Sequence, residues 1–304
     1  MPHQKTTPRC FADIQDPRLQ VIRNAQNLGV AQSINHGMAI ATAPLVARYD
    51  GDDVWQPHAL ERLADALDAH PAAVVAYGDV QTINQHGELG DRLHSHTDQQ
   101  PRSAAVFEPL LVQHFTCAPA MLFRRDAWRK VLPWPEQFKS GLGDWYFNLK
   151  FAQMGPFVYL PERLALYRVH DQGMHTHYMQ SAVGEANTRA ILAEFLPLAD
   201  ESKLGQSRRQ VRDRHLMAIA AGYRFIGKLS DARRLWLEVA RSSPILLFKA
   251  PFSPQQFRRY CSVGITRRSN SACAEGLKTQ LNQSRCNRYN RASRQADPIR
   301  LTQL

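Results

Sequence analysis

The chain has 304 residues, 44% of them hydrophobic, and a formal net charge of +11. This length allows one large domain or two smaller ones, whereas no run approaches the roughly 20 apolar residues that a membrane-spanning helix needs. Residues 1–201 carry 17 Lys and Arg against 22 Asp and Glu, while residues 202–304 carry 21 against 5. The positive charge therefore belongs to the second part, and only that part is a candidate to bind anionic lipid or nucleic acid.

Cysteine usage and the first residues favour a cytoplasmic protein. The five cysteines are scattered and form no Cys-x-x-Cys pair, which fits reduced thiols better than a disulfide framework. The N-terminal segment MPHQKTTPRCFADIQ has no apolar stretch of the kind found in secretory signals. We therefore expect a cytoplasmic location, with the basic half able to bring the chain to the inner face of the membrane.

Hydrophobic periodicity in the first 80 residues predicts alternating strands and helices. Residues 18–24, 45–47 and 72–80 are typical of short strands. Residues 30–43 and 57–70 carry apolar side chains at helical spacing. The order strand–helix–strand–helix–strand predicts an α/β fold with a mostly parallel sheet.

The pattern after residue 101 is mainly helical. The sequence predicts, in order, a strand giving way to a helix at Asp126, a helix over 144–155, paired extended segments over 157–170, and helices over 179–196 and 207–242. The last helical stretch is interrupted at Gly227, as in a helical hairpin. The residues beyond about 270 are polar, basic and aperiodic, so we expect them to be disordered.

Three carboxylates follow the strand expected at residues 45–47. Asp50, Asp52 and Asp53 lie within four positions, so water or a cation must relieve their mutual repulsion. A solvated turn is the simplest interpretation. Because open α/β sheets place ligands beyond strand ends, the cluster instead favours Mg²⁺ or Mn²⁺ shared with the phosphates of a substrate.

Four segments together resemble the family 2 glycosyltransferases, whose catalytic domain has the nucleotide-sugar-binding GT-A fold. In chain order they read VIRNAQNLGVAQSINHGMAIATAPLVARYDGDD, QPHALERLADALDAHP, GLGDWYFNLKFAQMG and LPERLALYRVH. No single segment is decisive, but all four stand in the family's order. The resemblance implies a GT-A-like catalytic domain over residues 16–178, followed by a helical region over 179–260 and a basic, disordered tail over 261–304.

This resemblance implies metal-dependent transfer of a sugar from a nucleotide-diphosphate sugar to a glycan or lipid-linked acceptor, in cell-envelope or exopolysaccharide synthesis. Asp50 and Asp52 would form the Asp-x-Asp pair that contacts a divalent metal (Mn²⁺ or Mg²⁺), with Asp53 beside them at the nucleotide sugar. His170 would complete the metal or diphosphate site, and Arg168 would pair with a phosphate. A structural role is the alternative for both of these last two residues.

The resemblance also implies that Asp144 is the catalytic base that deprotonates the acceptor hydroxyl. Its alternative is a helix N-cap, a common use of Asp, where the helix dipole would favour the charged form and weaken the carboxylate as a base. Family members often have a second carboxylate just before this position, where Gly143 stands here. Trp55, Trp145 and Tyr146 fit either stacking on a sugar or packing in the core.

The family's usual first strands have no counterpart before residue 18. These strands hold the base and ribose of the nucleotide in family members, so we expect an N-terminally truncated, incomplete GT-A-like sheet. A misassigned start or truncated gene, a partner chain that supplies the strands, and a non-catalytic binding protein are three explanations.

Two functions of other classes stay open. A catalytically inactive scaffold would dock its helical hairpin and basic half on a partner or an anionic membrane. A nucleic-acid binder using residues 202–304 is disfavoured, because the arginines lack interleaved aromatic residues and a recognised fold signature. The His-x-His pairs at 94–96 and 175–177 have the spacing of transition-metal ligands, but without nearby cysteines solvated loops are the better interpretation.

Overall fold

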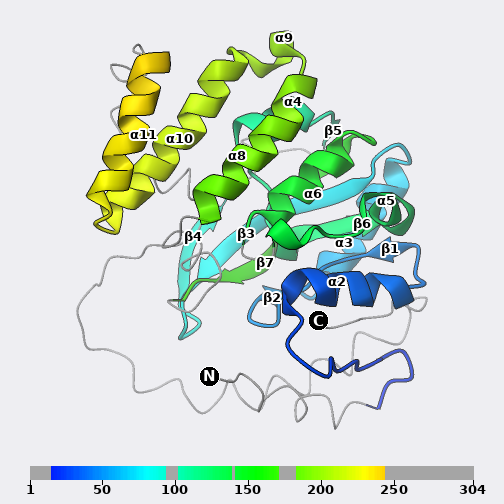
Figure 1. Ribbon diagram of the computed structural model, residues 1–304. Coiled ribbons are helices and arrows are strands. Elements are labelled where there is room, and N and C mark those ends of the chain that lie inside the picture. Colours follow the sequence, from blue (N-terminus) through cyan, green and yellow to red (C-terminus); the bar gives the residue numbers. More distant parts are fainter. Residues whose placement is uncertain (1–14, 94–101, 139–140, 171–182, 244–304) are drawn as a thin grey trace.

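The computed structural model describes residues 15–93, 102–138, 141–170 and 183–243 (Figure 1). An α/β unit comes first and a group of helices follows it, which confirms the predicted fold class with its C-terminal helical region. The predicted tail and both His-x-His pairs lie outside the described residues. Within the described ranges, no helix combines the length and the apolar character that crossing a bilayer requires.

The first elements surround the acidic segment. Helix α2 (Gly29–Ile40) leads to strand β1 (Leu45–Val46), and the acidic turn connects β1 to strand β2 (Val54–Trp55) and helix α3 (Ala59–Ala69). These elements confirm the predicted helices and the strand before the carboxylates. Each helix buries one apolar stripe, as its 3.6-residue period requires.

The prediction of a strand at residues 18–24 is wrong. The chain there is irregular and pairs with none of the described strands, and Val21 is exposed. An ion pair between Arg18 and Asp16 closes a turn at its start, with 2.6 Å between Nη2 and Oδ2. Alternating side chains alone do not form a strand when no neighbouring strand receives their backbone hydrogen bonds.

The sheet is mixed rather than mostly parallel. Its described strands follow the order β1-β6-β3-β7-β2, with β4 also on β3 and β5 on β7. The strands not yet located are β3 (Val75–Ile83), β4 (Leu89–Leu93), β5 (Arg102–Ala104), β6 (Met121–Arg124) and β7 (Phe157–Arg168). Among the described strands, only the neighbours β3 and β7 run parallel; β6 lies antiparallel between β1 and β3, and β4 returns antiparallel to β3 through a tight turn.

Strand β7 replaces the paired segments expected over residues 157–170. It is one strand, and its register against β3 is irregular after Gly78, where the partner changes from Leu160 to Arg163. A Cβ at Gly78 would overlap Leu164, so the close approach of the two strands requires glycine. Beyond this irregularity β7 pairs with β2, which brings its C-terminal end against the acidic turn.

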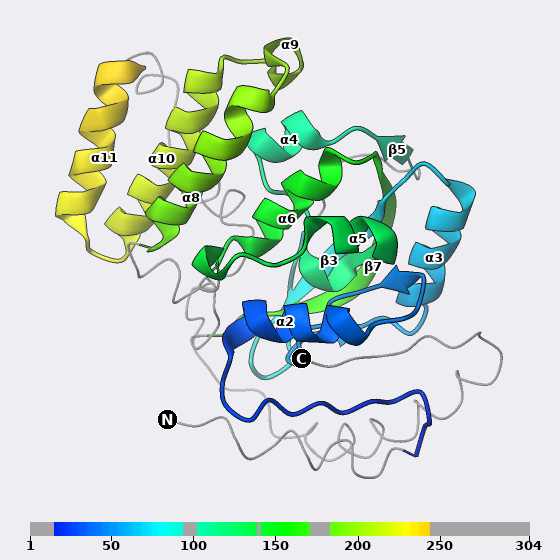
Figure 2. The same ribbon diagram turned by 45° about the vertical axis from the view of Figure 1, so that its right-hand side comes forward.

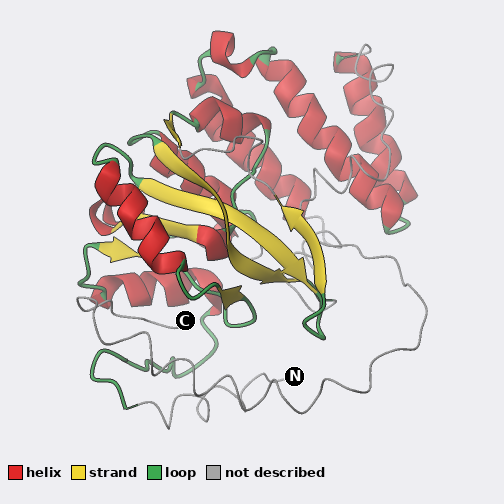
Figure 3. Cartoon of the chain, turned by 180° about the vertical axis from the view of Figure 1, so that it is seen from behind, coloured by secondary structure: helices red, strands yellow, loops and turns green. Residues whose placement is uncertain are grey.

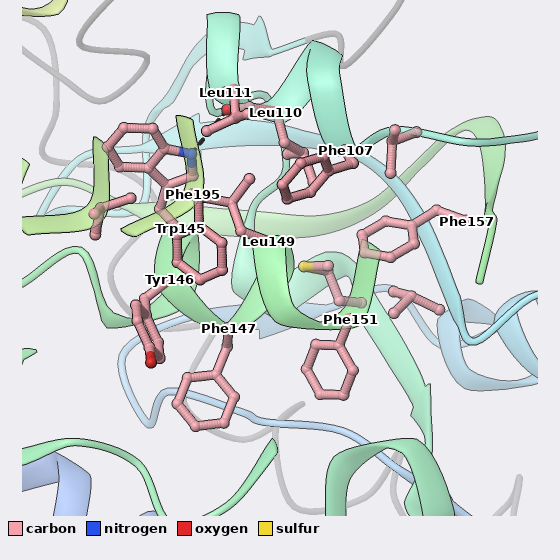
Figure 4. Packing of buried hydrophobic residues seen from close by; sticks show 14 of the residues in the cluster. Phe107, Leu110, Leu111, Trp145, Tyr146, Phe147, Leu149, Phe151, Phe157 and Phe195 are labelled. Atoms are coloured by element: carbon pink, nitrogen blue, oxygen red, sulfur yellow. Dashed lines mark hydrogen bonds between the residues drawn. The ribbon is translucent and has the colours of Figure 1, made fainter. Parts of the chain in front are cut away.

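Helices cover both faces of the sheet. On one face lie α4 (Phe107–Val112), α5 (Arg125–Val131), α6 (Gly143–Ala152) and a short 3₁₀ turn at Glu136–Phe138, while a second 3₁₀ turn, at Ala118–Ala120, precedes β6. An aromatic core surrounds α6 (Figure 4), and the buried Trp145 and Tyr146 belong to it, so core packing is the correct interpretation for both residues. Helix α3 packs on the opposite face, which Figure 3 presents.

The C-terminal helices form a separate layer beside α6 (Figure 2). They are α8 (Val183–Phe195), α9 (Glu201–Leu204), α10 (Arg208–Phe225) and α11 (Leu229–Ser242), with a 3₁₀ turn at Leu196–Leu198. Ser207 and Gln210 form a capping box that starts α10, and Gly227 adopts a φ of 81° in the turn before α11. The predicted helical hairpin is thus confirmed, whereas the domain limits near residues 178 and 260 stay predictions.

Candidate functional site

The three carboxylates lie in a fixed turn between β1 and β2. The N–H of Asp53 donates to the carbonyl of Asp50 at 3.1 Å, and the hydroxyl of Tyr49 donates to the carbonyl of Asp53 at 2.6 Å. Trp55 packs edge-on against Tyr49. The backbone of the turn is therefore set by local bonds, and each carboxylate points to a different environment.

Asp50 forms an ion pair with Arg48. The guanidinium donates from Nε to Oδ1 at 3.0 Å and from Nη2 to Oδ2 at 2.8 Å, and it lies over the ring of Trp134. Burial disfavours the charged form of Arg48, but the carboxylates of Asp50 and Asp144 outweigh it and raise the pKa. Arg48 thus connects the acidic turn with the candidate base.

Asp52 meets His170 from the end of β7. The imidazole Nε2 lies 3.1 Å from Oδ2 of Asp52, and both side chains keep part of their surface in solvent. The two residues are 118 positions apart in the chain. Two of the three residues expected at a metal are therefore adjacent, while the third, Asp50, is bound to Arg48.

Asp53 points into the protein, and only 5% of it is exposed. Its Oδ1 accepts a hydrogen bond from the N–H of Arg168 at 2.8 Å, whereas Oδ2 has no partner among the described residues. Burial raises the pKa of Asp53 to about 7. The hydrogen bond from the N–H of Arg168 lowers it, whereas the charges of Asp52 and Asp50 raise it further. A contact between Asp53 and a nucleotide sugar stays a prediction.

The guanidinium of Arg168 fastens the acidic turn to β3. Its Nε donates to the carbonyl of Asp52 at 2.7 Å, and its Nη1 donates to the carbonyl of Asn84 at 2.8 Å. These bonds give the side chain a structural role in the turn. Pairing of Arg168 with a phosphate stays a prediction.

Asp144 lies in the first turn of α6, at the second helical residue. The N-cap position belongs to Leu142, so the interpretation of Asp144 as an N-cap is wrong. Its Oδ1 accepts from the N–H of Trp145 at 2.9 Å. A Cβ at Gly143 would overlap the indole of Trp134, which explains in packing terms why no second carboxylate precedes Asp144.

Asp144 and the carboxylates of the acidic turn act on the pKa of the same two buried groups. Burial raises the pKa of the Cys117 thiol, and the charges of Asp53, Asp144 and Asp50 raise it further. The pKa of the Tyr167 hydroxyl on β7 is also raised. Burial is the largest cause, and the charges of Cys117 and of the same carboxylates add to it. Arg48, Trp134, Cys117 and Tyr167 were not predicted as site residues. Only Arg48 carried a sequence signal, because residues two apart in an extended segment share a side.

The donor set fits a metal that is shared with a substrate. Among the described residues, no three His, Cys, Asp or Glu side chains gather in a closed metal cage. Mg²⁺ sites in phosphate chemistry usually have only one or two protein carboxylates, and the remaining ligands are phosphate oxygens and water. Asp52 offers one carboxylate of this kind, which suits Mg²⁺ or Mn²⁺, and the imidazole of His170 lies beside it.

Comparisons with known proteins find similarity mainly in the first part of the chain. Residues 7–132 match the model of glycosyl transferase family 2, a range that includes the acidic turn. An uncharacterized glycosyltransferase of Nostoc sp. is 27% identical over 155 residues, 49% of this chain and 47% of that protein. The amylovoran biosynthesis glycosyltransferase AmsE of Erwinia amylovora is 30% identical over 70 residues, 23% of this chain and 26% of that protein.

A solved structure matches over a longer range at lower similarity. The mannosyltransferase PcManGT from Pyrobaculum calidifontis, in complex with GDP-Man and Mn²⁺, covers 80% of this chain and 68% of its own, with 14% identity and a TM-score of 0.41. The chain spans about half the length of the first curated relatives it matches.

Proposed function

Because residues 7–132 match the model of glycosyl transferase family 2, we propose that this chain transfers a sugar from a nucleotide-diphosphate sugar to a hydroxyl of a glycan or lipid-linked acceptor. The observation that carries the proposal is the contact of Asp52 with His170, which brings together two candidate groups 118 positions apart in the chain. Arg48 is paired with Asp50 and also interacts with the charge of Asp144. A diphosphate end and an acceptor end of one site would need such a neighbourhood.

Asp52 and His170 would hold the divalent ion at the diphosphate end. When bound, the ion supplies Lewis-acid stabilisation of the charge on the departing diphosphate. Asp50 would stay with Arg48, whose ion pair orients the carboxylate beside this position. The half-exposed Asp52, with 48% of its side chain in solvent, leaves room for phosphate oxygens.

Asp144 would receive the proton of the acceptor hydroxyl. The acceptor oxygen forms a bond to the anomeric carbon, the bond from that carbon to the diphosphate oxygen breaks, and the hydroxyl proton passes to Asp144. The N–H of Trp145 holds Oδ1 of Asp144, so the carboxylate is oriented before the acceptor arrives.

The class of acceptor is proposed from a relative and from the chemistry of the site. The relative from Erwinia amylovora is named for biosynthesis of amylovoran, and we propose an envelope polysaccharide or exopolysaccharide acceptor for this chain as well. Such an acceptor offers the sugar hydroxyl that the proposed base requires.

The test is release of nucleoside diphosphate and transfer of sugar, followed by mass spectrometry with a panel of nucleotide sugars and MnCl₂. Asp52→Asn and Asp144→Asn should each lower turnover by about 100-fold or more, since one removes a metal ligand and the other the base. Asp126→Asn is the matched control, because that carboxylate is 86% exposed on α5.

Equal turnover in Asp52→Asn, or after chelation of the metal, would remove the metal assignment. Nucleotide binding by calorimetry without turnover on any donor would instead support the non-catalytic alternative. His170→Gln tests the contribution of the imidazole, because His170 lies against Asp52. His86→Gln is the control, because His86 is exposed.

A further inference from the structure

Helix α11 has apolar side chains on two sides. Leu235 and Val239 are fully buried against α10, as expected for the inner stripe of a helical hairpin. Leu229 and Trp236, however, are 65% and 45% exposed. A soluble surface helix needs only the inner stripe, so the outer apolar residues call for another explanation.

Basic residues are interleaved with these exposed apolar side chains. Leu229, Arg233 and Trp236 follow one another at helical spacings of four and three residues, so they lie along one side of α11. Arg233 and Arg241 are both exposed, and Arg241, eight residues after Arg233, lies about 80° further round the helix, still on the side away from α10. We call Leu229, Arg233, Trp236 and Arg241 the outer face of α11.

The acidic side chains nearby are already engaged. Residues 202–243 contain ten Lys and Arg but only three Asp and Glu. Of these three, Asp213 is fully buried, Asp231 lies 3.6 Å from Arg234, and Glu238 pairs with Arg189 at 2.6 Å. The outer face therefore presents a positive potential with little local compensation.

The outer face is held in a fixed orientation at the edge of the helical layer. Figures 1 and 2 both show α11 beyond α10, on the side away from the sheet. Glu185 on α8 accepts from Arg234 at 2.6 Å and from Arg189 at 3.0 Å, which ties α11 to α8. The pairs are charge-assisted and bidentate at Arg234, so they position the hairpin well.

We propose that the outer face of α11 docks on a membrane surface rich in anionic lipid. Trp and Leu side chains enter the boundary between headgroups and acyl chains, while Arg side chains bind lipid phosphates and keep their charge in water. Charge complementarity selects this occupant, because the described face offers arginines and apolar groups without a carboxylate for a basic partner. Docking would bring the proposed glycosyltransferase site to lipid-linked acceptors. This consequence rests on the proposed function, whereas the docking itself is independent of it.

The test is flotation of the full chain with vesicles of 70% phosphatidylcholine and 30% phosphatidylglycerol, and with phosphatidylcholine alone. We expect binding to the anionic vesicles only, weakened by salt because the charges are exposed. Leu229→Ser with Trp236→Ser should lower the partition coefficient by about tenfold or more. The control is Leu89→Ser with Leu198→Ser, which removes two exposed leucines elsewhere, 62% and 61% exposed.

A second pair of variants isolates the charge. Arg233→Gln with Arg241→Gln should lower binding by about 25-fold, since each arginine near an anionic surface contributes roughly a fivefold factor. Arg129→Gln with Arg209→Gln removes two exposed arginines outside α11 and should change binding little.

The proposal is overturned if the wild type fails to bind anionic vesicles, binds neutral ones equally, or binds unchanged after loss of Leu229 and Trp236. Each variant must melt at the wild-type temperature when followed by circular dichroism. A loss of binding can then not be explained by a loss of folding. Vesicle binding that depends on the outer face in a chain without transferase activity would sink the proposed function and leave the docking intact.

Discussion

The imidazole of His215 packs on the indole of Trp145, with ring centroids 4.9 Å apart. His215 comes from α10, and its Nε2 donates to the carbonyl of Leu111 at 2.7 Å. Trp145 donates from its own Nε1 to the neighbouring carbonyl of Leu110 at 2.8 Å (Figure 4). The helical layer therefore fixes the residue next to Asp144.

His215→Ala should lower kcat by about tenfold at nearly constant KM, because it loosens the segment that orients Asp144 without touching substrate. His215→Gln should recover most of the activity, since its amide can donate to Leu111. His70→Ala is the control, because His70 also bonds a backbone carbonyl but at the end of α3. A KM effect of the same size as the kcat effect would contradict a positioning role.

The helices were predictable because their signal is local. Apolar residues at helical spacing located α2, α3 and the α10–α11 hairpin, and Gly227 marked the turn between the last two. The sheet depended on distant pairings, so the sequence could not indicate that β6 runs antiparallel between β1 and β3. Residues 18–24 had strand-like alternation but no partner to pair with.

The site also has a part that local sequence predicts and a part that depends on distant residues. The cluster of carboxylates was visible because its members are adjacent in the chain, and the strand before it fixed its place. That Asp53 turns inward while Asp52 faces His170 depends on β7, which lies more than 100 positions away. The role of Trp134 beside Gly143 was invisible for the same reason, since only the fold brings the indole to the glycine.

Arg48→Met should destabilise the protein and lower turnover together. The substitution keeps much of the volume but leaves Asp50 without its bidentate partner and removes the positive charge that interacts with both Asp50 and Asp144. We expect a loss of roughly 2–4 kcal/mol in unfolding free energy, measured by urea denaturation.

Arg48→Lys provides the comparison, because it keeps the charge without the fork of donors. It should fall between wild type and Arg48→Met in both stability and turnover. A Met variant as stable as wild type would mean that solvent already compensates Asp50.

Protonation of Asp53 should make stability fall as the pH rises. Its pKa is about 7 in the folded protein against 3.8 for an ordinary Asp, so the folded state binds more protons than the unfolded state between these values. The contribution is complete below about pH 4 and is lost by pH 7, and the pKa difference corresponds to roughly 4 kcal/mol at most.

The measurement is urea denaturation of wild type and Asp53→Asn from pH 5 to pH 8. The variant keeps an acceptor oxygen for the N–H of Arg168 and cannot ionise, so its profile should lack this decline. Asp126→Asn, at an exposed position on α5, should retain the wild-type slope. Parallel profiles for wild type and Asp53→Asn would show that Asp53 ionises normally.

Gly143 and Trp134 should behave as one unit. Gly143→Ala places a methyl group inside the indole of Trp134, so we expect a loss of about 2–3 kcal/mol and a displaced first turn of α6. Trp134→Leu alone should also destabilise, because the indole is buried and stacks on Phe147. The double variant should be less destabilised than the two single changes added together, since the smaller side chain makes room for the methyl group.

Thermal unfolding of the four proteins measures this coupling. Strict additivity would show that the backbone moves to accommodate the methyl group, and the packing explanation for the missing carboxylate before Asp144 would then fail.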